Sequence, residues 1–315
     1  ARGQNPQLEQ AIAEYRNANY EGAITLLSDL AQQEDTDRNV RKESLEYLGR
    51  AYVSQRMENE AREAIRELLE LEPPLVELDP GREPPPLMDL YYEIRKEIEG
   101  GYRVEGQSPG MKTIAIVDFT NNSVVEDRER LDPLQQGFAS LLINQLSGAT
   151  ELKIIERERL QWLLSEQDLQ RDARRVDQAT AVQMGRLLGA TNVLFGSFIQ
   201  QGRNMVISVR LVDVETGEIM MTEQVSGRAN QFFDLAEQLS MRVARSVNVS
   251  LEQTQLGARR DTRSLDAMMS YSEGLALLER RDYQSAYEKF LEALSYDPEY
   301  ERARVKAESI KPLLT

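Results

Sequence analysis

A spacing of small and apolar residues recurs three times in this chain of 315 residues, twice near its beginning and once near its end. The three series are Ala11, Ala23, Leu27 and Leu30; Gly49, Ala61, Ile65, Leu68 and Pro73; and Gly274, Ala286, Phe290, Ala293 and Pro298. Small residues let two antiparallel helices approach closely, apolar steps of 4 and 3 form a stripe on the second helix, and proline stops that helix. The spacing therefore predicts three helical hairpins.

The C-terminal copy resembles the tetratricopeptide repeat. The residues that carry this resemblance are Gly274-Leu275-Ala276-Leu277, Tyr283, Ala286, Phe290, Ala293 and Asp297-Pro298. The N-terminal pair is a looser match, because Asp35 stands where the repeat has a proline. The alternative is that the three hairpins are amphipathic by coincidence.

The middle of the chain changes from helical to strand periodicity. The pattern predicts strands at 112–119, 152–155, 191–201, 204–214 and 217–228, and helices at 131–146, through Leu160 to Leu164, at 179–188 and at 230–249. Short turns join the last three strands, so they are expected to form an antiparallel meander. The prediction is an α/β sandwich with a mainly antiparallel sheet, flanked by all-α hairpins.

Segments rich in proline and glycine suggest where the parts meet. We expect N-terminal repeats at 1–75, a linker with a short helix at 76–110, the α/β domain at 111–252, a linker at 253–263 and a C-terminal repeat at 264–315. The prolines from Pro73 to Pro86 cannot continue a helix, and this stretch is expected to run extended over the surface.

The middle domain resembles the CsgG family. The motifs that carry the resemblance, in the family's order, are Ile114-Ala115-Ile116-Val117-Asp118-Phe119, Ile155-Glu156-Arg157-Glu158-Arg159-Leu160, Leu163-Leu164-Ser165-Glu166-Gln167, 189–197 and 213–218. The resemblance implies a bacterial cell-envelope protein that binds and assembles, such as the curli secretion pore, activators of peptidoglycan synthases or flagellar ring components. It implies no catalytic chemistry.

The chain departs from the secretion pore in two respects. It has no N-terminal cysteine for a lipid, and its predicted turns are too short for hairpins that cross a bilayer. The first residue is Ala1, which fits either a trimmed chain or a mature protein left after signal-peptide cleavage. We expect the second, and hence a periplasmic, outer-membrane-associated or extracellular location.

Histidine and cysteine are both absent, which excludes Cys/His zinc sites, Ser-His-Asp and Cys-His pairs, and disulfides. The net charge of −15 makes nucleic acid and anionic lipid poor partners. No apolar run is long enough to span a membrane. We predict that the chain is not an enzyme and has no cofactor and no transition-metal site, while hard cations held by carboxylates alone remain open.

The candidate polar sites each have a structural reading. Asp118 follows the first strand, where open α/β sheets hold ligands, but capping or turn formation explains it better. Glu156 and Glu158 open a helix, where acidic side chains complement the dipole. The run at 185–190 lacks the Gly-Lys-Ser/Thr ending of a phosphate loop, so its glycines are expected to serve helix–sheet packing.

Aromatic residues are the candidate interface positions. They are Trp162, Tyr271, Tyr283, Tyr287, Tyr20 and Tyr52. Trp162 is the single tryptophan, and it is expected either to anchor an interface or to belong to the core. The tyrosines near the C-terminus belong first to the packing of the repeat, and their outer part is available to a partner.

The function expected from these features is a non-enzymatic, extracytoplasmic scaffold that acts through protein contacts. The alternative is a self-assembling subunit of an extracellular fibre or ring. A lone C-terminal hairpin must dock on its own α/β domain, on the N-terminal pair of the same chain, or on that pair in a neighbour. The third arrangement is head to tail and makes a homo-oligomer, either ring or filament.

Overall fold

The computed structural model describes residues 5–33, 35–71, 76–101, 112–149, 151–166, 177–249 and 262–314. The chain divides into two compact units. The first comprises Ala1–Gly100 and Val305–Thr315, and the second Gly101–Arg304. This division differs from the predicted domains at the C-terminus, where residues 305–315 were expected to stay with the last hairpin.

The first unit is helical. Its helices are α1 (Pro6–Arg16), α2 (Tyr20–Gln32), α3 (Arg38–Ser54), α4 (Glu58–Glu70) and α5 (Pro85–Glu99), with the second half of α14 (Glu301–Ile310) and the 3-10 turn Lys311–Leu314. Side chains of Asn5, Asn19 and Asp37 cap the starts of the first three helices. The pairs α1/α2 and α3/α4 pack together, as the spacing predicts.

Helix α5 lies in the segment that was expected to be a linker with a short helix, and it begins inside the proline run that was expected to be extended. It runs for 15 residues from Pro85 and buries Leu87, Leu90 and Ile94. Proline is compatible with the first turn of a helix, because its missing N–H would have no partner there, so the proline run begins this helix instead of excluding one. A Cβ at Gly49 would lie 2.9 Å from Leu87 Cδ1, which shows how closely α3 approaches α5.

The segment before α5 also differs from an exposed linker. Alternate residues Val76, Leu78 and Pro80 are buried and those between them are exposed, as in an extended segment with one face against a core. Glu83 accepts a bidentate pair from Arg50 of α3, at 2.7 and 2.5 Å. From the C-terminal part of the same unit, Lys306 Nζ donates to Pro80 O at 2.7 Å.

The second unit is built on a mixed sheet. Its described strands are β1 (Lys112–Ile116), β2 (Thr120–Asn121), β3 (Leu152–Ile155), β4 (Asn192–Gln201), β5 (Asn204–Asp213) and β6 (Ile219–Arg228). The order is β3-β1-β4-β5-β6, with β2 beside β4. Strands β4, β5 and β6 form the predicted antiparallel meander, while β1 pairs in parallel with β3 and β4.

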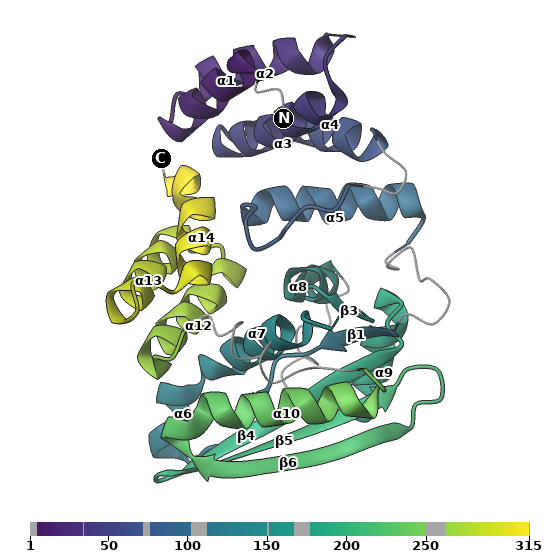
Figure 1. Ribbon diagram of the computed structural model, residues 1–315, viewed down its shortest axis with the longest axis vertical. Coiled ribbons are helices and arrows are strands. Elements are labelled where there is room, and N and C mark those ends of the chain that lie inside the picture. The colour runs from purple at the N-terminus through teal and green to yellow at the C-terminus, as the bar shows by residue number, and fades with distance from the viewer. Residues whose placement is uncertain are drawn as a thin grey trace. The chain divides into compact units, whose positions relative to one another are not determined.

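Helices cover the sheet on two faces (Figure 1). Helices α7 (Leu134–Leu146) and α10 (Phe232–Ser246) pack on the face that carries Ile114 and Ile116. Helices α8 (Arg157–Glu166) and α9 (Gln178–Leu188) pack on the face that carries Ala115 and Val117. Alternate side chains along this segment therefore belong to two different hydrophobic cores, as expected for a strand that is buried on both sides. A short helix, α6 (Val125–Leu131), and the 3-10 turn Ala229–Gln231 complete this part of the unit.

The glycines near 185–190 pack the helix on the sheet, as expected. A Cβ at Gly185 would lie 2.5 Å from Val214 Cγ2 and 2.7 Å from Val193 Cγ2. Gly189 ends α9 with a φ of 70°. Glycine adopts this left-handed conformation without the strain that a side chain would add.

Helices α12 (Leu265–Glu279) and α13 (Tyr283–Tyr296) form the C-terminal hairpin of the second unit. A Cβ at Gly274 would lie 2.5 Å from Phe290 Cε1, so the glycine of the repeated spacing lets the aromatic ring reach the partner helix. Tyr300, at the start of α14, is buried with its ring 5.1 Å from that of Tyr271.

Candidate functional site

A buried arginine joins the α/β domain to the C-terminal hairpin. Arg157, the first residue of α8, donates from Nε and from its terminal nitrogen to the two carboxylate oxygens of Asp118, each at 3.0 Å. Gln161 adds a third hydrogen bond to Asp118, at 3.1 Å. Asp118 follows β1, so this bidentate pair fixes the start of α8 against the end of the strand.

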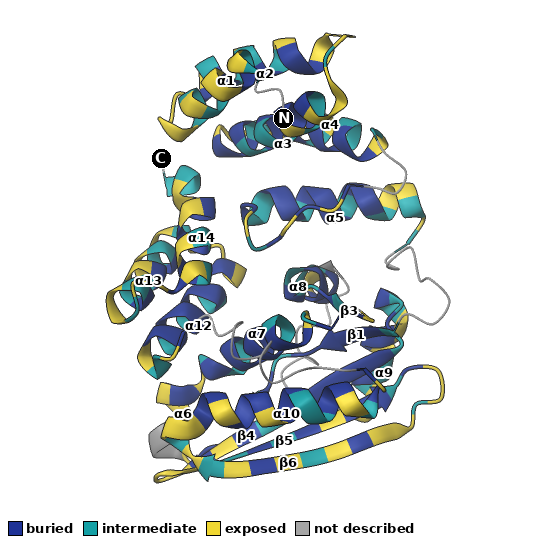
Figure 2. Cartoon of the chain, in the orientation of Figure 1, coloured by how far each residue is buried: buried dark blue, intermediate teal, exposed yellow. Residues whose placement is uncertain are grey.

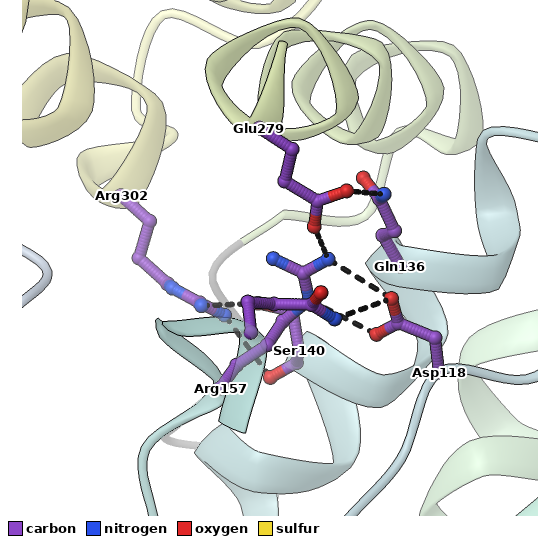
Figure 3. Close-up of polar contacts among 7 residues, drawn as sticks. Asp118, Gln136, Ser140, Arg157, Glu279 and Arg302 are labelled. Carbon is purple, nitrogen blue, oxygen red and sulfur yellow. Dashed lines mark hydrogen bonds and ion pairs between the residues drawn. The ribbon is translucent and has the colours of Figure 1, made fainter. Parts of the chain in front are cut away.

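The same guanidinium reaches the hairpin (Figure 3). Arg157 also pairs with Glu279, the last residue of α12. Gln136 of α7 donates to the other oxygen of Glu279 at 2.8 Å. One arginine thus holds carboxylates from two segments far apart in the sequence, and a glutamine of a third helix completes the set. We call Asp118, Gln136, Arg157, Gln161 and Glu279 the ionic junction.

Burial controls the electrostatics of the ionic junction. The Arg157 side chain is 6% exposed. Burial lowers its pKa, but the charges of Asp118 and Glu279 offset this effect, so the pKa of the guanidinium lies above its ordinary value. Burial raises the pKa of Glu279, and Arg157 opposes that rise in part. The junction therefore works as a charge-compensated contact.

A close helix contact lies beside the ionic junction. A Cβ at Gly137 of α7 would collide with Ser272 Oγ of α12 and would lie 3.1 Å from Ser272 Cβ. Met268, one turn earlier on α12, belongs to the same buried cluster as the apolar side chains of α7. Helix α12 therefore docks on α7 of its own chain through a site where no side chain fits.

Arg302 makes a second polar contact with α7. It donates to the backbone oxygen of Ser140 at 3.2 Å and also bonds the Ser140 hydroxyl (Figure 3). Its guanidinium lies over the Tyr271 ring, 5.4 Å from the ring centre. Arg302 therefore links the start of α14 both to α12 of the hairpin and to α7 of the α/β domain.

This arrangement answers the docking question raised by the sequence. The C-terminal hairpin packs on its own α/β domain, so the argument that it must find a neighbouring chain no longer holds. Asp118 also differs from the expected cap or turn residue, because it accepts a buried arginine. The run Glu156–Arg159 was expected to have a structural or interfacial role, but nothing in the sequence indicated that Arg157 pairs with Asp118 and Glu279.

The predicted interface aromatics fall into two groups. Tyr20 and Tyr271 are 6% and 1% exposed, so in this structure both rings are buried and neither offers surface to a partner. Trp162 is half-buried and packs against the core beneath α8 and α9. Tyr52, Tyr283 and Tyr287 are half-buried and stay candidates.

The chemistry available to the ionic junction is limited. Asp118 is engaged in a bidentate pair with a cation that does not lose its proton, so it lacks the freedom of a general base. Within the described ranges, no group of three or more acidic side chains is placed to hold a metal ion. None of the helices in those ranges is long and apolar enough to cross a membrane.

The family described as curli production assembly/transport component CsgG matches residues 102–207. This stretch contains β1, α7, α8 and β4, and therefore Asp118, Gln136 and Arg157. Glu279 lies outside it. The residues that receive the hairpin thus belong to the matched region, and the hairpin does not. Comparison with curated proteins gave no match.

Several solved structures resemble part of this chain weakly. The LpoB C-terminal domain from Salmonella enterica is 14% identical, with 42% of this chain and 91% of that chain covered and a TM-score of 0.27. Lipoprotein GNA1162 from Neisseria meningitidis is 18% identical, with 43% and 94% covered and a TM-score of 0.31. TolB from Acinetobacter baumannii is 11% identical, with 44% and 28% covered and a TM-score of 0.29. Scores this low say nothing about function.

Proposed function

We propose that this chain is a non-enzymatic assembly protein of the bacterial cell envelope that works outside the cytoplasm through protein contacts. The observation that carries the proposal is the match of residues 102–207 to a family of assembly and transport components. The missing histidine and cysteine are consistent with it, because the commonest nucleophile and base pairs need those residues.

The docked hairpin is the part of the chain that we expect to contact other proteins. The matched region uses Gln136 and Arg157 to hold Glu279, and Gly137 to admit α12. A hairpin held in one orientation loses little conformational freedom when it binds, which favours affinity. We propose that the α/β domain serves as a rigid base and the hairpin as the surface it presents.

We further propose that the hairpins are tetratricopeptide repeats. The support is the position of their glycines. A Cβ at Gly49 would lie 3.0 Å from Ile65 Cδ1, and one at Gly274 2.8 Å from Phe290 Cδ1. In both hairpins the small residue of the first helix therefore faces the apolar residue 16 positions later. The same pairing recurring in two units favours a shared repeat over coincidence.

The experiment is site-specific photo-crosslinking of the full chain in the bacterium that makes it. A photoreactive side chain is placed at Tyr287 on α13, and a matched one at Ser208 on the sheet. We expect the chain in the envelope fraction, with discrete adducts to envelope proteins from the hairpin position. A chain confined to the cytoplasm, or identical adducts from both positions, contradicts the proposal.

The fibre or ring subunit is the weaker candidate. This hypothesis arose because the sequence showed no packing partner for the C-terminal hairpin. In the structure the hairpin packs on α7. We therefore do not carry it forward.

A further inference from the structure

Strand β6 ends the sheet on one side. In the order β3-β1-β4-β5-β6, it pairs with β5 alone among the described strands (Figure 1). The pairing is regular from Met221 to Arg228, on the C-terminal side of a register shift. Exposed residues alternate with buried or half-buried ones along this stretch, because α10 packs on one face of the strand (Figure 2). An open edge of this length presents a row of N–H and C=O groups to another strand.

The outward backbone groups can be identified from the hydrogen bonds to β5. Ala229 N donates to Arg203 O at 2.9 Å, directly beyond the last pair of the register. Hydrogen-bonded and non-hydrogen-bonded pairs alternate in an antiparallel ladder, so the odd-numbered residues of β6 bond to β5. The N–H and C=O groups of Thr222, Gln224 and Ser226 therefore point away from the sheet. All three residues are exposed.

Little in the sequence protects this edge from pairing. Natural sheets guard exposed edges with proline, lysine or an inward-pointing charge, and the stretch from Met221 to Gly227 contains neither proline nor lysine. Its one charged residue is Glu223, whose charge is compensated by Arg242 of α10 at 2.5 Å. Arg242 also donates to Gln224 O at 3.4 Å. Because a carbonyl oxygen has two lone pairs, Gln224 O can accept a second hydrogen bond from another strand.

The edge is complementary to itself in an antiparallel arrangement. A two-fold axis at Gln224 sets this residue opposite Gln224 of a second copy, and sets Thr222 opposite Ser226 of that copy. Every outward N–H between residues 222 and 226 then meets an outward C=O. The side chains that face each other are neutral and can hydrogen-bond across the strands.

The two neighbouring registers are weaker. An axis one residue earlier would set Glu223 opposite Glu223, and like charges directly opposite destabilise a strand pair. An axis one residue later would need the N–H of Arg228, which already donates to Gln231 Oε1 at 3.1 Å. The axis at Gln224 has neither disadvantage.

The charges at the two ends of the β5–β6 hairpin indicate what covers the edge. Arg203 and Arg228 lie at one end, Glu215 and Glu218 lie at the other, and all four are exposed. In the antiparallel pair the basic end of each molecule lies beside the acidic end of the other, whereas a parallel pair would set like charges together. A second copy of this chain therefore fits the edge in charge as well as in hydrogen bonding.

We propose that the outer edge of β6 pairs antiparallel with β6 of a second copy, about a two-fold axis at Gln224, so that two sheets become one. Such an interface closes at two molecules, and therefore differs from a head-to-tail filament. A contact made mainly by one strand edge is small beside the roughly 1,200 to 2,000 Å² of a stable interface, so we expect the dimer to be weak and to depend on concentration. The inference goes beyond the proposed function, and an envelope partner could bind with or without it.

A single cysteine in the full chain, which has none of its own, tests the two-fold axis. Gln224→Cys should give a disulfide-linked dimer on mild oxidation, because hydrogen-bonded partners have Cα atoms about 5.5 Å apart, within the range of a disulfide. Ser226→Cys is the matched control on the same edge. Its two copies lie four residues apart in this register, about 14 Å, and should not be linked. Equal yields of dimer from the two variants, or no dimer from Gln224→Cys, overturn the proposal.

Sedimentation velocity of the full chain tests the backbone contact without oxidation. We expect a reversible monomer–dimer equilibrium between about 1 and 200 µM. Ser226→Pro removes an outward N–H and should weaken the dimer at least about fivefold, while Ser226→Ala keeps that N–H and should leave the equilibrium unchanged. Gln224→Lys places two lysines together at the axis and should also weaken the dimer, without a proline in the strand.

Three results of the sedimentation experiment would overturn the proposal. The first is a wild-type chain that is monomeric throughout, as expected if the edge of β6 receives a strand of a different protein. The second is an equal effect of the two Ser226 variants, and the third is a Gln224→Lys variant that associates like the wild type.

Discussion

Two helix junctions in this molecule use arginine and glutamate in different surroundings. In the first unit, Arg62 and Arg66 of α4 pair with Glu93 and Glu97 of α5, through side chains that are 31 to 45% exposed. In the second unit, Arg157 is 6% exposed, and it pairs with Asp118 and Glu279, whose side chains are 21% and 32% exposed. An exposed pair contributes little and yields to salt, whereas loss of one partner from a buried pair leaves an uncompensated charge. The two junctions therefore differ mainly in the burial of the arginine, and we expect the junction with the buried arginine to contribute more to stability.

The largest effect is expected from removing the buried cation. Arg157→Met leaves Asp118 and Glu279 near each other without compensation, and should lower the free energy of unfolding of the second unit by about 3 to 5 kcal/mol. Urea denaturation measures it, with Arg62→Met as the matched control on the exposed junction. Equal losses in the two variants would show that burial is not the deciding difference.

The next effect comes from the close helix contact. In Gly137→Ala the new methyl meets Ser272, so α12 must move away from α7, at a cost of about 1 to 3 kcal/mol. Ser272→Ala in the same chain should recover part of it. Gly101→Ala is the control, since no described atom lies within 4 Å of a Cβ there. If the two glycine variants unfold at the same urea concentration, the contact is looser than described.

A smaller effect concerns pH. The pKa of Glu279 is raised above the ordinary 4.5, so the folded state holds its proton where the unfolded state has lost it. As pH rises from about 4.5 through that raised pKa, wild-type stability should therefore fall relative to Glu279→Gln. Denaturation of both proteins across this window gives the difference. A difference that is flat or grows with pH contradicts the assignment.

The smallest effect belongs to the exposed junction. Arg62→Gln removes pairs with Glu93 at 2.6 Å and Glu97 at 3.2 Å, yet should cost about 0.2 to 1 kcal/mol at low salt. The loss should shrink further at 1 M salt, where the Debye length is about 3 Å. Denaturation at the two salt concentrations checks this, and a large loss that is insensitive to salt would place this junction with the buried one.

Most helices and strands could be predicted from the local spacing of apolar residues. The Gly49 and Gly274 series gave the hairpins, and alternation gave the meander of β4, β5 and β6. A short helix was expected between residues 76 and 110, but its start at Pro85 was missed because the prolines up to Pro86 were interpreted as an extended segment, although proline also suits a first turn. The period of a segment depends on its own residues, so it can be recognised without the rest of the chain.

The ionic junction could not be found in the same way. Arg157 lies 39 residues from Asp118 and 122 from Glu279 in the sequence, and no local spacing records such a contact. One signal was available. Gly137 and Ser140 are small residues three positions apart on α7, a spacing that places them on one face and indicates a close helix neighbour.

The central claim is that the C-terminal hairpin docks on its own α/β domain. The chain has no cysteine, so Gly137→Cys with Ser272→Cys introduces a single pair, on carbons that lie 3.1 Å apart before relaxation. That is a few tenths of an ångström below the usual range of about 3.5 to 4.5 Å for a disulfide. Mild oxidation of the full chain, followed by non-reducing electrophoresis and mass spectrometry, reports where the bond forms. The account predicts a disulfide within one chain in monomeric protein, and disulfides that link separate chains would contradict it.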